Sequence, residues 1–388
     1  MRRVYFDNNA TTPVLPEVFE AMRPYFFEHF GNASSIHHHG QETRAAVERA
    51  RESVAALLGC RPSEIVFSSG GTESDNLAIF GLFKPGNHVI SSTIEHHAVL
   101  NSCKHLQSAG CEVTCVPVDG HGLIDPDDVR RALRPNTKLI TIMMANNETG
   151  VLQPVEDVGR IAAEADVYFH TDAVQAAGKV PVDVKRIGCD LLSISGHKMH
   201  GPQGIGALYI RKGTTLQPML HGGSHERSRR AGTENVPGIV GLGKAAEIAK
   251  AALDRGELSR MAEMRDQIEQ KILAEVEAIG INGAGAPRVP NTTSIYFEGI
   301  EGEALVIALD LKGLAVSTGA ACSSGAIEPS HVLIAMGLPA ERARASIRFS
   351  LGKQNTPEEV EFALRLVPEI VTRLRELSPV YNKAAVSN

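Results

Sequence analysis

The sequence has no tryptophan, and aromatic residues make up only 5% of its 388 residues. It also has no apolar run long enough to cross a bilayer, which excludes a membrane-spanning protein. The formal net charge is -6, and this acidic balance argues against a protein built to bind nucleic acid. Met1-Arg-Arg leads directly into a strand-like Val-Tyr-Phe, without the apolar core of a signal peptide, so we expect a cytoplasmic protein.

Cysteine is scarce as well, and no two of the six cysteines form a CxxC pair. Cys111 and Cys115 are spaced CxxxC, but the residues between them are typical of a strand and no second ligand pair lies nearby. A zinc site is therefore not expected there, and disulfides are not expected in a reducing compartment. Three consecutive histidines at 37–39 suggest a metal, but adjacent side chains point in different directions and rarely chelate one ion.

The residue pattern predicts a mostly parallel α/β sheet with a second, smaller unit. Strand-like segments alternate with helical segments over residues 65–210, which is typical of a parallel sheet covered by helices. Residues 238–279 are nearly all helix-forming and are expected to lead out of this sheet. We expect a large α/β domain over residues 14–255 and a small α+β domain over residues 256–388, with residues 1–13 packed on the small domain.

Some local boundaries follow from the same pattern. Residues 32–40 are expected to form a polar loop, and apolar spacing predicts an amphipathic helix over residues 45–58. Residues 138–144 are predicted to be a strand. Thr356-Pro-Glu-Glu359 has the form of a capping box with proline at the first helical position, so it is expected to begin a last helix that ends near Leu377.

Residues 190–202 combine a buried strand with a sharp glycine turn that presents Lys198. In open α/β sheets, ligands bind beyond the carboxyl ends of the strands, and Lys198 lies at such an end. A lysine there can be a surface charge or a phosphate ligand. When it is desolvated and neutral, it can instead form a Schiff base with a carbonyl such as the aldehyde of pyridoxal phosphate. On this stretch alone the surface charge is the commoner outcome.

Two more strand ends carry groups that suit the same cofactor. Ser68-Ser-Gly-Gly-Thr72 follows a strand and opens a helix, so its N–H groups and the Thr72 hydroxyl suit one phosphate, although a plain capped turn fits equally well. Asp172 ends another strand, where it can pair with a pyridine nitrogen or cap a helix. The order of phosphate turn, Asp172 and Lys198 along one sheet edge favours the cofactor site.

Four other features are candidates for binding or catalysis. His96 begins a predicted helix, where it can stack on a planar cofactor and transfer protons, or simply cap the helix. The charged loop 221–235 is either solvated or an anion-binding arm that reaches a neighbouring subunit. Cys322 lies in a segment of small residues with little to bury it, and an exposed thiol suits nucleophilic attack. Arg348 lies on a predicted strand, and a substrate carboxylate would give it a partner.

Four motifs together make the chain resemble a pyridoxal-phosphate cysteine desulfurase of the class V aminotransferase superfamily, closest to the group I, NifS/IscS-like type. They are Ser69-Gly-Gly-Thr72-Glu-Ser-Asp-Asn, Ser195-Gly-His-Lys198, His221-Gly-Gly-Ser-His-Glu-Arg and Ala321-Cys322-Ser-Ser-Gly. The resemblance covers nearly the whole chain, from Asp7-Asn-Asn-Ala-Thr-Thr-Pro13 to Arg348-Phe-Ser-Leu-Gly352 and beyond. It implies the aminotransferase-like α/β fold (fold type I) with pyridoxal 5'-phosphate as cofactor.

The resemblance also implies a role for each candidate residue. Lys198 would hold the cofactor and move the substrate's Cα proton, His96 would stack on the ring as an acid/base, and Cys322 would attack the substrate sulfur. Asn147 and Arg348 would bind the substrate, L-cysteine. Other contacts to the cofactor would come from Asn147, from Asp172 at the ring nitrogen, from Gln175 at the ring hydroxyl, from Gly71, Thr72, Ser195, Gly196 and His197 around the phosphate, and from Thr233 of a partner subunit.

The activity implied is desulfuration of L-cysteine to L-alanine, with the sulfur held as a persulfide on Cys322. A homodimer with shared active sites would pass this sulfur to an iron–sulfur scaffold or another acceptor protein, and Cys322 could transiently ligate a cluster. One alternative is a selenocysteine or cystine C–S lyase, which the Cys322 segment disfavours. Another is a catalytically silent scaffold-docking protein, which has no need of Lys198, Asp172 and His96 together.

Overall fold

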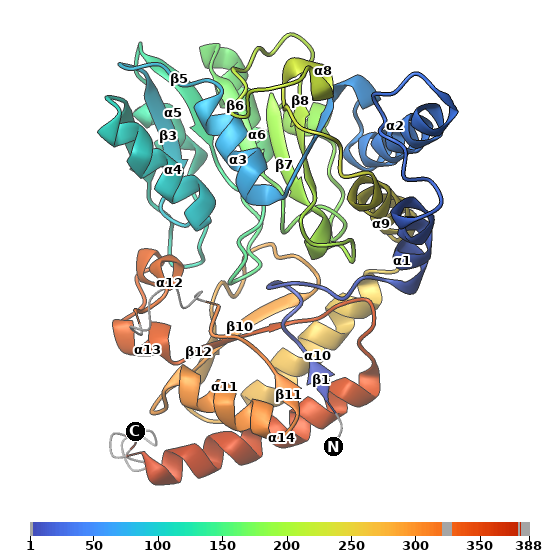
Figure 1. The fold of residues 1–388 in the computed structure, drawn as a ribbon. Helices are drawn as coiled ribbons and strands as arrows, with labels where there is room; N and C mark the ends of the chain where they lie inside the picture. The colour runs from blue at the N-terminus through green and yellow to red at the C-terminus, as the bar shows by residue number, and fades with distance from the viewer. Residues whose placement is uncertain (1–2, 320–327, 379–380, 382–388) are drawn as a thin grey trace.

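The computed structural model describes residues 3–319, 328–378 and 381. Cys322 lies outside the described residues. The chain forms a large sheet covered by helices and, below it in Figure 1, a smaller sheet with its own helices. No helix in the described part of the chain is long and apolar enough to cross a membrane. The same residues contain no group of three His, Cys, Asp or Glu side chains that could hold a metal ion.

The large sheet has seven strands in the order β2-β8-β7-β6-β5-β3-β4. Strand β8 runs antiparallel to β2 and β7, whereas the pairs among β3 to β7 are parallel. The mostly parallel α/β fold predicted from the sequence is therefore confirmed. The strands are β2 (Ile65–Ser68), β3 (His88–Ser92), β4 (Glu112–Val116), β5 (Thr137–Thr141), β6 (Tyr168–Asp172), β7 (Leu191–Ser195) and β8 (Gly206–Ile210).

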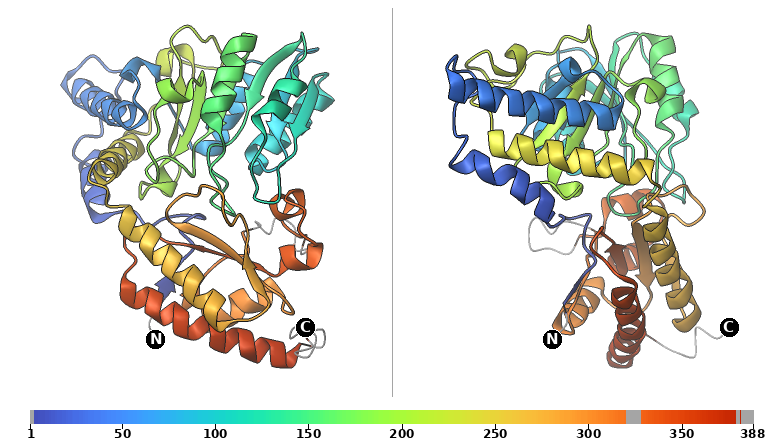
Figure 2. Two further views of the ribbon diagram at one scale, coloured as in Figure 1. Left: turned by 180° about the vertical axis from the view of Figure 1, so that it is seen from behind. Right: turned by 90° about the vertical axis from the view of Figure 1, so that its right-hand side faces the viewer.

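Helices cover both faces of this sheet because successive strand residues point to opposite sides. Ile65 and Phe67 pack in one core with apolar residues of α2 (His38–Leu58), α6 (Val155–Ala165) and α9 (Val236–Asp254). Val66, between them, packs in a second core with α3 (Gly71–Phe80) and α4 (His97–Ser108). Figure 2 shows α1 (Pro16–Met22), α2 and α9 side by side on one flank. Shorter helices follow at α5 (Pro126–Ala132), α7 (Val184–Ile187) and α8 (His225–Ser228).

The small sheet is antiparallel, with the order β12-β10-β9. Beside it, the N-terminal strand β1 pairs in parallel with β11, so the N-terminal residues lie among elements from the C-terminal part of the chain (Figure 1). The predicted capping box of Thr356 and Glu359 is present at the start of the last helix, α14. The domain boundaries at 14–255 and 256–388 stay a prediction. The elements are β1 (Val4–Tyr5), α10 (Ser259–Glu275), β9 (Ile279–Ile281), β10 (Thr292–Phe297), α11 (Gly302–Leu311), β11 (Leu314–Ala315), α12 (His331–Ala335), α13 (Ala340–Arg344), β12 (Ser346–Ser350) and α14 (Pro357–Leu377).

Two predicted boundaries were wrong. Helix α2 begins inside the predicted polar loop, because the side chain of His37 accepts a hydrogen bond from the backbone of Gly40 and caps it. The strand predicted at 138–144 ends at Thr141, although the backbone of Ile142 and Met144 still bonds to that of His170 and Asp172. Residues 238–279 are nearly all helical, as predicted, but they form two helices, since Gly256 takes a left-handed φ of 67° where α9 ends.

Candidate active site

The carboxyl ends of the parallel strands open onto a cavity of about 390 Å³ that also touches the small sheet. Gly196 lies in the same turn as Lys198, within the short 3-10 helix η3 (Gly196–Lys198). Thr233 is exposed in the loop before α9, outside this cavity. The cavity lining brings together the predicted residues Gly71, Thr72, His96, Asn147, Asp172, Gln175, Ser195, His197, Lys198 and Arg348.

Lys198 is held by backbone oxygens, and no carboxylate of the described residues forms an ion pair with its amine. Its Nζ donates to the carbonyl oxygens of Asn9 and Ala10, at 2.6 and 2.7 Å. Burial lowers the pKa of Lys198 to about 8, helped by the charge of Arg348 and opposed by those of Asp7 and Asp172. A substantial fraction of this amine is therefore neutral, and nucleophilic, close to neutral pH.

The rate at which cofactor-free protein captures pyridoxal phosphate should rise through pH 8. The neutral amine attacks the aldehyde, and its population grows as the pH passes the pKa of Lys198. The check is the growth of visible absorbance after mixing, from pH of about 6 to about 10. A rate that keeps rising until the ordinary pKa of lysine is reached would contradict the lowered pKa of Lys198. The exposed Lys185, changed to Met, serves as the control and should leave the profile unchanged.

The first turn of α3 forms an open anion cradle. The helix begins after Gly70 without a side-chain cap, so its first backbone N–H groups remain available. A Cβ on Gly71 would lie 2.8 Å from Cγ2 of Val174, so only glycine lets this backbone approach so closely. His197 lies on the other side of the cradle, where its Nδ1 is 3.1 Å from the Thr11 hydroxyl. This geometry suits a phosphate group.

Asp172 and His96 give the cavity a buried carboxylate and a neutral imidazole. The Asp172 side chain accepts from the backbone of Val174 at 2.9 Å. Burial raises the pKa of Asp172, while His96 and Lys198 lower it. His96 caps α4, with its Nδ1 accepting from Ala98 at 3.1 Å, and burial lowers the pKa of this imidazole. Because Nδ1 is an acceptor, the proton of the neutral ring is on Nε2.

Arg348 enters the cavity from β12 with N–H donors to spare. It donates to the backbone of Asn147 at 2.8 Å and to the carboxylate of Asp7 at 2.7 Å. Its Nε is buried and has no hydrogen-bond partner among the described residues. A buried guanidinium with an unused donor suits a ligand carboxylate.

The sequence did not identify several residues that build this site. Asp7 and Asn9 were given no role, yet they contact Arg348 and Lys198. Lys179 and Asp75 were not singled out, although both are buried, and Asp75 lines the cavity with its Oδ1 3.6 Å from Nε2 of His170. The only available signal was the run of polar residues at 7–12 in a segment without apolar periodicity.

The donor set fits pyridoxal phosphate at each of its three reactive parts. The open first turn of α3 matches the phosphate, and a cationic ring nitrogen would supply the counter-charge that buried Asp172 lacks. The partly neutral amine of Lys198 matches the aldehyde. These three groups lie around one cavity, as the cofactor requires.

Known proteins with similar sequences cover almost the whole chain. It is 51% identical over 382 residues to a cysteine desulfurase IscS of Dictyoglomus turgidum, with 97% of each chain covered. It is 52% identical over 386 residues to a cysteine desulfurase IscS of Methanosarcina thermophila, which covers 98% of this chain and 95% of the relative. These relatives confirm the resemblance to cysteine desulfurases that the motifs indicated.

Solved structures agree with this result. A NifS-like protein superposes with a TM-score of 0.89 at 40% identity, covering 96% of this chain and all of the other. SspA in complex with cysteine gives a TM-score of 0.78 at 39% identity, covering 89% of this chain and 98% of the other. The family model described as aminotransferase class-V matches residues 4–362. By sequence and by fold, the chain belongs to the class-V aminotransferase family.

Proposed function

We propose that this chain is a pyridoxal-phosphate-dependent cysteine desulfurase, which converts L-cysteine to L-alanine and holds the sulfur as a persulfide on Cys322. The observation that carries the proposal is the meeting of Lys198, Asp172 and Arg348 around one cavity. The relatives named cysteine desulfurase, and the similar structure solved with cysteine, support the same substrate.

Each of four residues at the cofactor site has a separate role in the proposed reaction. When bound, pyridoxal phosphate supplies an electron sink that stabilises negative charge at the substrate's Cα. The carboxylate of Asp172 would keep a proton on the ring nitrogen, and neutral His96 would stack on the ring. Lys198, with a pKa near 8, takes a proton from Cα and returns it, which suits an acid/base at neutral pH. Arg348 fixes the substrate carboxylate.

Cys322 completes the reaction as the nucleophile. Its thiolate attacks the sulfur of the substrate, so that a sulfur–sulfur bond forms while the carbon–sulfur bond breaks. The electron pair of the broken bond stays with carbon, which takes up a proton and becomes the methyl group of alanine. The persulfide then passes its outer sulfur to an acceptor, for which we propose an iron–sulfur scaffold or another sulfur-accepting protein. Transient ligation of a cluster by Cys322 belongs to the same proposal.

A homodimer with shared active sites is part of the proposed function. Large apolar side chains are exposed together near the N-terminus, at Phe19, Phe26, Phe27, Phe30 and Ile36, with Ile36 90% exposed. An exposed apolar surface of this kind favours contact with another chain. Thr233, exposed and outside its own cavity, is free to reach the phosphate in a second subunit.

The deciding experiment supplies the purified protein with pyridoxal phosphate, L-cysteine and a reductant, and measures alanine and sulfide. Equal amounts of both products, formed only with L-cysteine, are the expected result. Turnover of selenocysteine or cystine without turnover of L-cysteine would favour a lyase instead. Protein that cannot bind pyridoxal phosphate would favour a scaffold-docking protein.

Changing Arg348 to Lys should raise the KM for L-cysteine by about 10- to 100-fold, with a smaller change in kcat. Lysine keeps the ion pair with Asp7 but loses the planar fork that holds a carboxylate by two hydrogen bonds. Steady-state alanine formation measures both constants. Arg342, which is exposed and pairs with Glu298, gives the control Arg342→Lys. An unchanged KM in Arg348→Lys would place the substrate carboxylate elsewhere.

A further inference from the structure

Lys179 is a buried lysine held by neutral oxygen atoms. It follows β6 in the chain, and only 8% of its surface is exposed. Its Nζ donates to Oε1 of Gln175 at 2.5 Å and to Oδ1 of Asn9 at 3.0 Å. Among residues 3–319 and 328–378, no carboxylate forms an ion pair with it. Burying an amine without a carboxylate is costly, so the position calls for a functional reason.

The lysine fixes which way the amide of Gln175 faces. In the structure the Nζ of Lys179 donates to Oε1 of Gln175, so the amide oxygen faces the lysine. The amide nitrogen then lies on the opposite side, where Nε2 donates to the backbone oxygen of Asn9 at 3.0 Å. Gln175 also lines the active-site cavity. Lys179 therefore makes Gln175 a donor, and not an acceptor, toward that side.

Asn9 connects Lys179 to the amine of Lys198. Its side-chain oxygen accepts from Lys179 and from Asn291, at 3.0 and 3.1 Å. Its side-chain nitrogen donates to Asn147 and Thr292, at 3.1 and 2.9 Å. Its backbone oxygen accepts from Lys198 at 2.6 Å. Because every polar atom of this side chain is engaged, a change at one end of the network moves the other.

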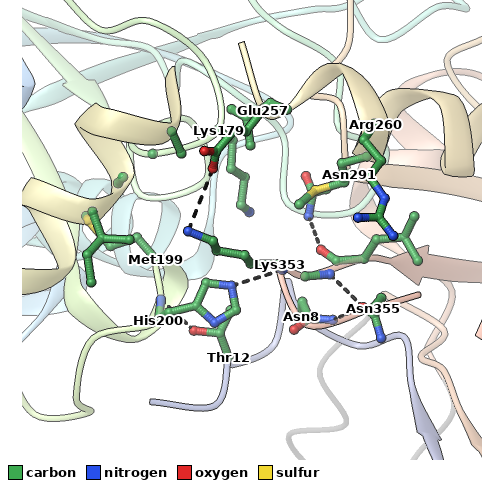
Figure 3. Close-up of a pocket in the computed structure, with 18 of the residues that line it drawn as sticks. Asn8, Thr12, Lys179, Met199, His200, Glu257, Arg260, Asn291, Lys353 and Asn355 are labelled. Carbon is green, nitrogen blue, oxygen red and sulfur yellow. Dashed lines mark hydrogen bonds and ion pairs between the residues drawn. The ribbon is translucent and has the colours of Figure 1, made fainter. Parts of the chain in front are cut away.

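A second cavity, of about 380 Å³, lies behind this network. Its lining includes both Lys179 and Lys198, and Lys198 also lines the active-site cavity, so Lys198 stands in the wall between the two cavities. Figure 3 shows Lys179 among the residues around the second cavity, with Lys353 and His200. A small molecule in this cavity can therefore reach the position of the Lys179 side chain.

We propose that Lys179 is a positioning residue of the cofactor site. It turns the amide nitrogen of Gln175 toward the ring hydroxyl of pyridoxal phosphate and holds the Asn9 carbonyl against Lys198. The inference rests on the proposed function, and it adds a residue that touches neither substrate nor cofactor.

The test is the pH at which the visible absorbance of the bound cofactor changes. The ring oxygen of the cofactor shares a proton with the neighbouring nitrogen, and a hydrogen-bond donor fixed at this oxygen competes with that proton. When the donor is lost, the proton binds more tightly and its pKa rises. Lys179→Met should therefore raise the midpoint by about one pH unit. The midpoint of Lys179→Arg, which keeps a donor, should lie between those of the wild type and Lys179→Met. Lys185→Met, six residues along and exposed, should match the wild type.

Lys179→Ala provides an independent arm, because the space it leaves opens onto the second cavity. Ethylamine added to this variant should move the midpoint back toward the wild-type value, whereas ethanol, which carries no amine, should leave it shifted. Wild-type protein with ethylamine corrects for direct reaction of the amine with the cofactor. A merely structural lysine would show neither the shift nor the rescue.

The outcomes separate this inference from the proposed function. If the wild type binds pyridoxal phosphate and turns over L-cysteine, the function stands whatever the variants do. If folded Lys179→Met, or folded Lys179→Ala without amine, then has the same midpoint as the wild type, the proposed role of Lys179 is overturned and the proposed function is not. If the wild type neither binds the cofactor nor turns over, both proposals fall.

Discussion

Changing Lys198 to alanine is expected to remove the visible absorbance of the bound cofactor and to lower alanine formation by more than about 1,000-fold. The buried amine is the group placed to hold the aldehyde and to move the Cα proton, and its pKa near 8 suits both tasks. Lys179, which bonds to the same residue Asn9, is engaged by Asn9 and Gln175 and so is poorly placed to replace it. Absorbance spectra after gel filtration and alanine assays measure the two effects.

Lys212→Ala is the matched control, since Lys212 is exposed and lies away from the cavity. It should keep both the spectrum and the turnover of the wild type. A Lys198→Ala protein that retains its absorbance after gel filtration, with the aldehyde still bound covalently, would show that another amine holds the cofactor.

Changing Cys322 to serine should lower alanine formation by at least about 100-fold while the bound cofactor keeps its absorbance. A serine hydroxyl stays protonated near neutral pH and attacks sulfur poorly, whereas a thiolate is a soft and effective nucleophile. Binding of L-cysteine should survive, because Arg348 and the cofactor site are unaltered. The measurements are alanine and sulfide production, together with the change in absorbance when L-cysteine is added.

Cys115→Ser is the comparison variant, because Cys115 is an exposed cysteine on β4 within the described part of the chain. Its activity should equal that of the wild type. Turnover in Cys322→Ser at more than half the wild-type rate would contradict the persulfide step and favour a lyase that releases sulfur directly.

Much of the fold could be predicted from the sequence, because the buried strands are short apolar runs between helical segments. The alternation of strands and helices predicted over residues 65–210, and the strand predicted around Arg348, are present in the structure. Where apolar periodicity continues without proline, the pattern cannot tell one helix from two. The left-handed Gly256, which separates α9 from α10, is an example.

The strand-end residues of the site were predictable for a geometric reason. Parallel strands end at the same edge, so Asp172 and Ser195 had to lie close together once the sheet was recognised. The polar network around Asn9 could not be predicted in this way. It depends on hydrogen bonds between Asn9, Lys179, Asn291 and Lys198, which are far apart in the chain and belong to no repeating pattern.

The pairing of the N-terminal strand bears on how the protein is made. Val4 pairs with Leu314, and the backbone of Asn8 bonds to that of Ser350, so these contacts cannot form until residues 314 and 350 have been synthesised. Contacts across such sequence distances form late and slowly. Asn9 and Ala10, which hold the amine of Lys198, belong to this segment. In a growing chain, the segment that holds the amine of Lys198 is therefore fixed in place only after Ser350 has been synthesised.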